Sequence, residues 1–369
     1  MKNKRILIVS AAFYPDNTPR AFRSTELAKE FARMGHYVEV LTKKRAFDYT
    51  VFETEFSCRI FDKIEVKKYS ANIFQRKRGY LRRIIDRILY QAFMYPDILI
   101  SFAIRKALLQ SFCGYDLILS VAKPHSVHLG CAMALKRNKL LATKWIADCG
   151  DPFTLCKTDA YKFIFYFKCI ERWMFKLTDF ISIPVESAKG AYYREFYPKL
   201  RIIPQGFSFE TIRIYTGSVV NPVPTFAYAG AFYNKTRNPQ RLLDYLTMIP
   251  DDFKFIIYTH SVDVVESYQF KLQTRLEIRK PIPREKLLFE LSKMDFLLNI
   301  ENMHKEQVPS KIIDYALTKR PILSINPDNP DIDKIIQFIH GDYSGALVFD
   351  NINDYNIKRI VNQFLDLLV

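Results

Sequence analysis

The feature that most constrains this chain is a repeated alternation of short apolar segments with amphipathic ones. Residues 5–10 (RILIVS) form a β-branched apolar run, and a helical pattern follows over about 20–34. Gly35 ends that pattern, and residues 37–42 (YVEVLT) are typical of a second strand. This order predicts a βαβ unit, and the continuous apolar strand favours a parallel sheet that is covered on both faces.

The same alternation continues along the chain. Further strands are predicted at 116–120, 144–147, 180–184, 201–203, 225–228, 253–258, 276–278, 296–300 and 321–324, with helix-like sequence between them. We therefore expect an α/β protein built from two doubly wound, Rossmann-like domains that face each other across a cleft.

A break in the pattern predicts where the domains divide. A chain of 369 residues is expected to form about two domains. Residues 207–224 are polar, poorly periodic and contain two prolines, which favours an interdomain linker. The predicted N-terminal domain is then 1–206 and the C-terminal domain 225–350. Residues 351–369 have apolar positions at helical spacing and predict a final helix that can pack back towards the first domain.

Composition excludes several classes of protein. Hydrophobic residues make up 49% of the chain and charged residues 25%, which is typical of a globular protein rather than a disordered or collagen-like one. The six cysteines include no CxxC pair and no spacing suited to zinc, so free thiols are expected. We find neither a signal-peptide pattern nor an apolar run long enough to span a bilayer, and we expect a cytoplasmic protein.

The net charge of +16 requires an anionic partner, and part of it is concentrated in one segment. Residues 63–87 carry nine Lys or Arg against two acids, interleaved with aromatic and aliphatic residues. This pattern favours an amphipathic helix on an anionic membrane, so that the protein is peripheral on the inner face of the cell membrane. A solvated helix face is the alternative. No signature of a nucleic-acid-binding domain is present, and no nucleic acid is expected as partner.

Residues 306–323 (EQVPSKIIDYALTKRPIL) carry the clearest chemistry. They resemble the nucleotide-sugar site of family-4 glycosyltransferases, retaining GT-B enzymes of capsular, exopolysaccharide or lipid-linked glycan biosynthesis. The resemblance implies that Asp314 binds the ribose and that Glu306, as a catalytic residue, faces the donor sugar. A loop that enters a helix offers free N–H groups to a diphosphate, so this segment is also a phosphate site: Pro309, Ser310 and Lys311.

Residues 228–238 (YAGAFYNKTRN) resemble the first strand and loop of the same family's C-terminal domain. Gly230 would let the backbone approach the phosphates, and Lys235 and Arg237 would neutralise them. Cationic and N–H groups can stabilise a leaving diphosphate without a metal, and no suitable DxD pair is present. We therefore expect no metal and no cofactor. The co-substrate implied is a UDP-sugar, with a GDP- or dTDP-sugar as the alternatives.

Two stretches of the first half add to the resemblance. Residues 13–23 resemble the family's opening loop, and residues 115–153 resemble a stretch of capsular and lipid-linked glycan transferases, except that Cys149 and Gly150 replace a Phe-Arg pair and one positive charge is lost. Acceptor-side contacts are then expected from Asn17, Thr18, Arg23 and His128. Titratable groups at strand ends are further catalytic candidates: His125, Asp148 and Asp151.

These resemblances run in order over nearly the whole chain. They imply a metal-independent hexosyltransferase that transfers a sugar, with retention, to a polyprenyl-linked or oligosaccharide acceptor of surface polysaccharide biosynthesis. Two other functions stay open. One is a GT-B-like protein that has lost catalysis and binds an anionic polymer or membrane, and the other is a nucleotide-sugar epimerase.

Overall fold

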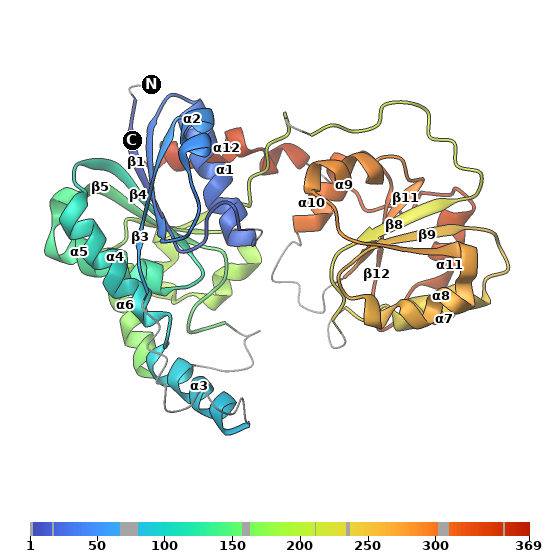
Figure 1. Cartoon of the computed structure of the whole chain (residues 1–369), viewed down its shortest axis with the longest axis horizontal. Helices are drawn as coiled ribbons and strands as arrows, with labels where there is room; N and C mark the ends of the chain where they lie inside the picture. The colour runs from blue at the N-terminus through green and yellow to red at the C-terminus, as the bar shows by residue number, and fades with distance from the viewer. Residues whose placement is uncertain are drawn as a thin grey trace. The chain divides into compact units, whose positions relative to one another are not determined.

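The computed structural model describes residues 3–16, 18–66, 80–156, 163–210, 212–233, 237–301, 310–349 and 351–369. The chain divides into two compact units (Figure 1). Unit 1 contains Met1–Phe207 together with Ile357–Val369, and unit 2 contains Ser208–Asn356. The last helix of the chain is therefore part of the first unit.

Unit 1 is built on a seven-stranded parallel sheet with the strand order β3-β2-β1-β4-β5-β6-β7. Its strands are β1 (Arg5–Ser10), β2 (Tyr37–Lys43), β3 (Cys58–Ile64), β4 (Tyr115–Ala122), β5 (Ala142–Cys149), β6 (Phe180–Ile183) and β7 (Leu200–Ile202). In β1 every residue after Arg5 is buried, as a central strand covered on both faces requires.

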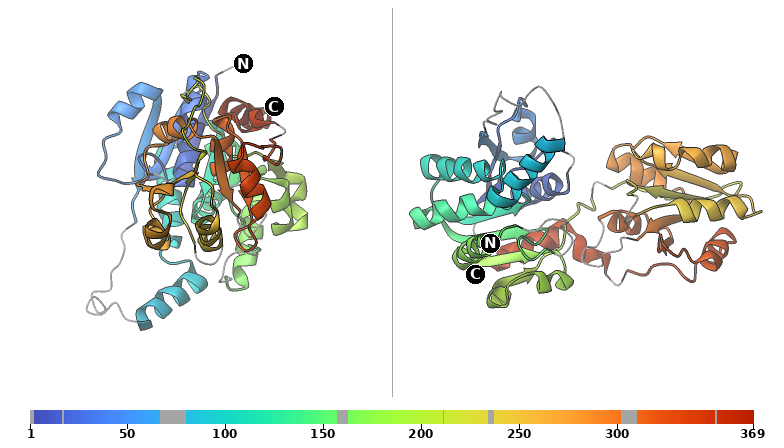
Figure 2. Two further views of the ribbon diagram at one scale, coloured as in Figure 1. Left: turned by 90° about the vertical axis from the view of Figure 1, so that its right-hand side faces the viewer. Right: turned by 90° about the horizontal axis from the view of Figure 1, so that it is seen from below.

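Helices cover both faces of this sheet (Figure 2). They are α1 (Pro19–Arg33), α2 (Thr50–Phe56), α4 (Ile98–Ser111), α5 (Ser126–Arg137), α6 (Tyr166–Leu177) and α12 (Ile357–Asp366), whereas α3 (Tyr80–Phe93) projects from the unit. Alternate β1 side chains enter two separate cores, with α1 and α12 on one face and α4, α5 and α6 on the other. Phe31 of α1 and Phe364 of α12 lie 6.5 Å apart between ring centroids, which anchors the returning helix.

Unit 2 repeats the architecture with five parallel strands in the order β10-β9-β8-β11-β12. The strands are β8 (Thr225–Ala229), β9 (Lys254–Tyr258), β10 (Leu276–Arg279), β11 (Phe296–Ile300) and β12 (Ile322–Ile325). The helices are α7 (Gln240–Met248), α8 (Glu266–Leu272), α9 (Arg284–Leu291), α10 (Ser310–Leu317) and α11 (Ile332–Ile339). Phe226 stacks on Phe255 and Phe296 at 4.7 and 4.6 Å and holds three neighbouring strands together.

The predicted fold class, α/β with two doubly wound Rossmann-like domains, is confirmed. The sequence pattern does not indicate β3, because Asp62 and Lys63 interrupt its apolar run, and this edge strand pairs only with β2. Among the described residues, no helix is long and apolar enough to cross a membrane.

Candidate functional site

The carboxyl ends of the unit 2 strands meet at one edge of the sheet, where β8 leads into a turn at Gly230. The φ angle of Gly230 is +145°, a region that favours glycine, and its N–H donates to the Tyr258 carbonyl at 3.0 Å. A side chain here would be strained and its Cβ would lie 3.2 Å from the Tyr228 hydroxyl. At this turn the backbone itself, and no side chain, therefore lies at the sheet edge.

Tyr228 lies at this edge, two residues before Gly230, next to the cationic side chains of Lys311 and Arg237. Its buried ring stacks on Phe232 at 4.7 Å, and its hydroxyl donates to the Ala231 carbonyl at 3.0 Å. The Lys311 ammonium lies 4.3 Å from the ring centroid, a cation–π contact. Burial raises the pKa of Tyr228 to about 12, while the nearby Arg237 acts in the opposite direction.

Lys311 is a buried amine whose described contacts include no hydrogen bond. Burial, and then the positive charge of Arg237, lower the pKa of Lys311 well below its usual value. An anion bound beside both cations would remove this penalty.

Asp314 lies one turn further along α10 and is held by Arg284 at the start of α9. Nε and Nη2 of Arg284 donate to the same oxygen, Oδ1, at 2.9 and 2.6 Å. Burial raises the pKa of Asp314, and the charge and hydrogen bonds of Arg284 oppose that effect. Oδ2 accepts no hydrogen bond from a described residue, so the second carboxylate oxygen is available to a ligand.

Tyr315 fixes α10 against the end of β8. Its hydroxyl accepts a hydrogen bond from the Ala229 N–H at 2.7 Å, although the two residues are 86 positions apart. Neither this contact nor the roles of Tyr228 and Arg284 follow from the sequence motifs. The only signal for them is that Tyr228 and Tyr315 lie inside segments that carry the resemblance.

Four of the predicted site residues lie outside the described part of the chain: Asn17, Lys235, Glu306 and Pro309. Of Ser310 only the backbone is described, as the first residue of α10. Their roles stay predictions. Among the residues that the structure does describe, no three His, Cys, Asp or Glu side chains are grouped as a metal site would need.

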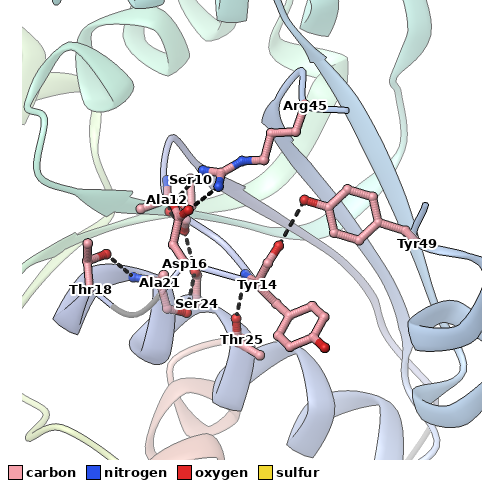
Figure 3. A network of polar contacts seen from close by, with 10 residues as sticks. All are labelled: Ser10, Ala12, Tyr14, Asp16, Thr18, Ala21, Ser24, Thr25, Arg45 and Tyr49. Carbon is pink, nitrogen blue, oxygen red and sulfur yellow. Dashed lines mark hydrogen bonds and ion pairs between the residues drawn. The ribbon is translucent and has the colours of Figure 1, made fainter. Parts of the chain in front are cut away.

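In unit 1 the loop after β1 is held in place by side chains of its surroundings (Figure 3). Tyr49 donates from its hydroxyl to the Tyr14 carbonyl at 2.8 Å, and Thr25 accepts from the Tyr14 N–H at 3.1 Å. Arg45 pairs with Asp16. Thr18, predicted on the acceptor side, caps α1 by accepting from the Ala21 N–H at 3.2 Å, which gives it a structural task in addition.

Arg23 and Asp148 form a buried ion pair beneath this loop. Nε and Nη2 of Arg23 donate to the two carboxylate oxygens at 3.0 and 2.8 Å, and Ser182 donates to Oδ1 at 2.6 Å. Burial raises the pKa of Asp148, but Arg23 and Ser182 outweigh it and hold the pKa below the usual value. Both side chains are 3 to 4% exposed, so their geometry is that of a structural pair. Their predicted acceptor and catalytic roles are untested.

His128 is also enclosed. Its Nδ1 lies 2.8 Å from the Ser120 hydroxyl and its Nε2 3.4 Å from the Cys149 sulfur, while Trp145 donates to the same hydroxyl at 2.8 Å. Burial lowers the pKa of His128 to about 4, with Asp148 opposing, so the ring is neutral at physiological pH. Its contacts give it a packing role, and acceptor binding stays a prediction.

Arg20, which the sequence motifs do not single out, restores positive charge at this edge. Its guanidinium reaches from the first turn of α1 to Gly150, where a Cβ would overlap it. The resembled sequences have an arginine at the position of Gly150. Here Arg20 of α1 supplies a positive charge at that place. Asp151 lies 3.9 Å from the Lys123 ammonium, and His125 stacks on Phe153 at 4.6 Å.

Solved structures share this architecture over their full length, whereas no family model and no curated protein matches the chain. A glycosyltransferase from Rickettsia africae has a TM-score of 0.65 at 13% identity, over 100% of this chain and 98% of that one. Anabaena HepE, solved with UDP and glucose, has a TM-score of 0.60 at 11% identity, over 99% of both chains. The chain has the GT-B fold.

The GT-B fold is not confined to one activity. A UDP-GlcNAc 2-epimerase from Methanocaldococcus jannaschii has a TM-score of 0.57 at 10% identity, with 99% of each chain covered. At such identities the likeness establishes architecture, and the activity has to be argued from the residues of the site.

Proposed function

We propose that this protein is a glycosyltransferase that moves a sugar from a nucleoside diphosphate sugar to a glycan or polyprenyl-linked acceptor in surface polysaccharide biosynthesis. The observation that carries the proposal is the arrangement around Tyr228. Gly230 exposes backbone, Lys311 places a buried ammonium there without a described hydrogen-bond partner, and Asp314 keeps one oxygen available. A diphosphate and a ribose need these three kinds of group.

In this proposal Lys311 and Arg237 bind the diphosphate together with the N–H groups at the start of α10. Lys235, Pro309 and Ser310 add to the same subsite. The leaving diphosphate gains negative charge in the transition state, and fixed cations in a partly desolvated site stabilise it. We therefore propose a reaction that needs no metal, so EDTA should leave the rate unchanged.

Asp314 would accept hydrogen bonds from the ribose hydroxyls through Oδ2, because Arg284 occupies Oδ1. Glu306 would face the donor sugar. UDP is the proposed nucleotide, with GDP or dTDP as the alternatives, and transfer of a hexose with retention is the proposed outcome. The solved complexes of Anabaena HepE with UDP and glucose support this choice of donor.

We also propose that residues 63–87 lie on the anionic inner face of the cell membrane. The described part of this segment includes the first part of α3, and the helix bears exposed Ile84, Ile85 and Ile88 next to exposed Arg83 and Arg87. A helix with adjacent apolar and cationic side chains can lie in a membrane interface, and each cation near an anionic surface contributes roughly 1 kcal/mol.

The decisive experiment is incubation with a panel of UDP-, GDP- and dTDP-sugars, with and without a short prenyl diphosphate-linked sugar, and mass analysis of the products. A glycosylated acceptor supports the proposal. Epimerised nucleotide sugar without transfer would favour the epimerase that the M. jannaschii neighbour suggests. Binding without turnover of any donor would favour a GT-B-like binding protein.

Asp314→Asn tests the site itself. We expect nucleotide affinity to fall at least tenfold in titration calorimetry, because the amide has one accepting oxygen, for which Arg284 and the ribose compete, and the contact is no longer charge-assisted. Asp333→Asn on α11, an exposed acid outside the site, is the matched control and should leave the affinity unchanged. Equal nucleotide affinities for the two variants would show that Asp314 does not contribute to nucleotide binding.

A further inference from the structure

A cavity of about 260 Å³ opens at the carboxyl edge of the unit 1 sheet, and neither Arg23 nor Asp148 lines it. Its walls come from the ends of β2, β4 and β5 and from the end of α3. One wall is polar and carries Lys43, Lys123 and His125, while the other is apolar and carries Tyr90, Met94 and Phe163. None of the contacts assigned above to the donor involves these residues.

The polar wall has an excess of positive charge. Lys43 is the last residue of β2, is half-buried, and forms no ion pair with a described residue. Lys123 lies 3.9 Å from Asp151, and the guanidinium of Arg20 lies at Gly150, the residue before Asp151. Asp97 is the acid on the cavity lining. With Arg20 included, three cations lie at this wall against two acids, Asp97 and Asp151, and this excess favours an anionic ligand.

His125 is the second, independent sign of a ligand. The side chain is more than nine-tenths buried, and neither ring nitrogen makes a hydrogen bond of good geometry to a described residue. It stacks on Phe153 with an interplanar angle of 25°, which fixes the ring on the wall. Burial, His128 and Lys123 lower the pKa of His125, so the ring is neutral and offers one donor and one acceptor. A buried polar group of this kind calls for a partner.

The apolar wall continues outward from the cavity. Tyr90 and Phe163 lie 5.3 Å apart between ring centroids, and the Ile164 N–H donates to the Gln91 carbonyl at 3.5 Å, so α3 and the segment before α6 form one surface. Phe93 and Phe165, on the same two segments, are 60% and 76% exposed. Figures 1 and 2 show α3 projecting from the body of unit 1. An apolar chain could leave the cavity along this surface.

We infer that the cavity binds an amphiphile that carries a phosphate or diphosphate next to a prenyl-type chain. The anionic head contacts Lys43, Lys123 and His125, and the first part of the chain lies against Tyr90, Met94 and Phe163. The inference rests on the proposed glycosyl transfer, since it names the acceptor class and the residues that recognise it. It differs from the membrane contact of α3, which involves a lipid surface rather than one bound molecule.

The test uses the full-length protein and three probes in titration calorimetry, without nucleotide. Farnesyl diphosphate has both the charge and the chain, inorganic diphosphate has the charge only, and farnesol has the chain only. We expect farnesyl diphosphate to bind at least tenfold more tightly than either of the others. If inorganic diphosphate binds as tightly, the site recognises a free anion, and if farnesol does, it is an apolar groove; either result overturns the inference.

Matched variants locate the site. Lys43→Gln should weaken farnesyl diphosphate binding about tenfold, and Tyr90→Ser should weaken it several-fold. The controls Lys44→Gln and Phe102→Ser change an exposed lysine and an exposed ring outside the cavity, and should change nothing. Equal affinities for Lys43→Gln and Lys44→Gln would place the amphiphile elsewhere and reject the inference.

UDP binding to the same samples separates this inference from the proposed function. If UDP binds but farnesyl diphosphate does not, the inference fails and nucleotide-sugar chemistry stands. If farnesyl diphosphate binds to the wild type and not to Lys43→Gln while no nucleotide binds, the site is supported and the proposed glycosyl transfer fails.

Discussion

Buried charged side chains at the carboxyl edges of the two sheets differ in whether other side chains pair with them. In unit 1 Arg23 and Asp148 are almost fully buried and satisfy each other, with Ser182 as a third partner. In unit 2 Lys311 is buried beside a second cation, and no described residue hydrogen-bonds to it. Since unpaired buried charge is costly, a pair of the first kind holds a fold together, whereas we propose that a charge of the second kind binds a ligand.

The largest effect should come from breaking the satisfied pair with Asp148→Asn. The change leaves Arg23 buried without its counter-ion, and such a loss costs about 3–5 kcal/mol of unfolding free energy. Both tryptophans, Trp145 and Trp173, lie in unit 1, so tryptophan fluorescence during denaturant unfolding reports this unit alone.

Glu55→Gln on α2 is the control for this measurement, because its side chain is exposed and its loss should change the stability by less than about 0.5 kcal/mol. A cost below about 1 kcal/mol for Asp148→Asn would contradict the structural role of the pair.

The second effect concerns a buried acid of unit 1 whose charge is only partly compensated. Glu171 is fully buried, and although Thr154 donates to one carboxylate oxygen, burial raises its pKa to about 7. The folded state therefore keeps a proton that the unfolded state releases near its ordinary pKa of 4.5. The resulting stability is present below about pH 4.5 and is lost as the pH rises through about 7.

Glu171→Gln should flatten this pH dependence and gain about 2–3 kcal/mol relative to the wild type at pH 8. Unfolding curves between pH 4.5 and 8, followed by tryptophan fluorescence, measure it. Parallel pH profiles for the two proteins would show that Glu171 is ionised in the folded state. Glu55→Gln again controls for a general loss of negative charge.

Lys311→Met should separate stability from binding in unit 2. Removing a buried amine that has no described hydrogen-bond partner should leave the unfolding free energy unchanged or raise it by about 1 kcal/mol, since the desolvation penalty disappears. The affinity for a nucleoside diphosphate should fall at least tenfold, because a charge-assisted contact is lost. Calorimetric melting and nucleotide titration give both numbers.

Lys286→Met, an exposed lysine of α9, is the matched control for both measurements. If Lys311→Met lost much stability and kept its nucleotide affinity, Lys311 would be a structural charge like Arg23. The two sheet edges would then not differ in this respect.

The smallest effect is expected from Gly150→Ala in unit 1. The new methyl group meets the end of the flexible Arg20 side chain, which can move aside, so the stability should change by less than about 1 kcal/mol. The displaced guanidinium should lower farnesyl diphosphate affinity only two- to threefold. A larger loss of stability would show that Arg20 is held as tightly as Arg23.

The sequence predicts some residues of the candidate site and not others. Asp314 and Lys311 are candidates because their segment resembles a known nucleotide-sugar site and enters a helix from a loop; their roles stay predictions. Arg284 is not found, because it lies 30 positions from the carboxylate that it binds and in a helix with no motif of its own. Arg20 is also not found, since its contact with Gly150 depends on how α1 packs against the end of β5.

The α/β class and the two doubly wound halves are determined by the amino-acid pattern, because the spacing of apolar residues within each segment decides whether it forms a buried strand or an amphipathic helix. Which charges are satisfied and which are left for a ligand is decided only by the tertiary structure. Arg23 and Asp148 are 125 positions apart, and they pair because the sheet brings the start of α1 to the end of β5. The local spacing of apolar residues does not predict contacts between residues so far apart in the sequence.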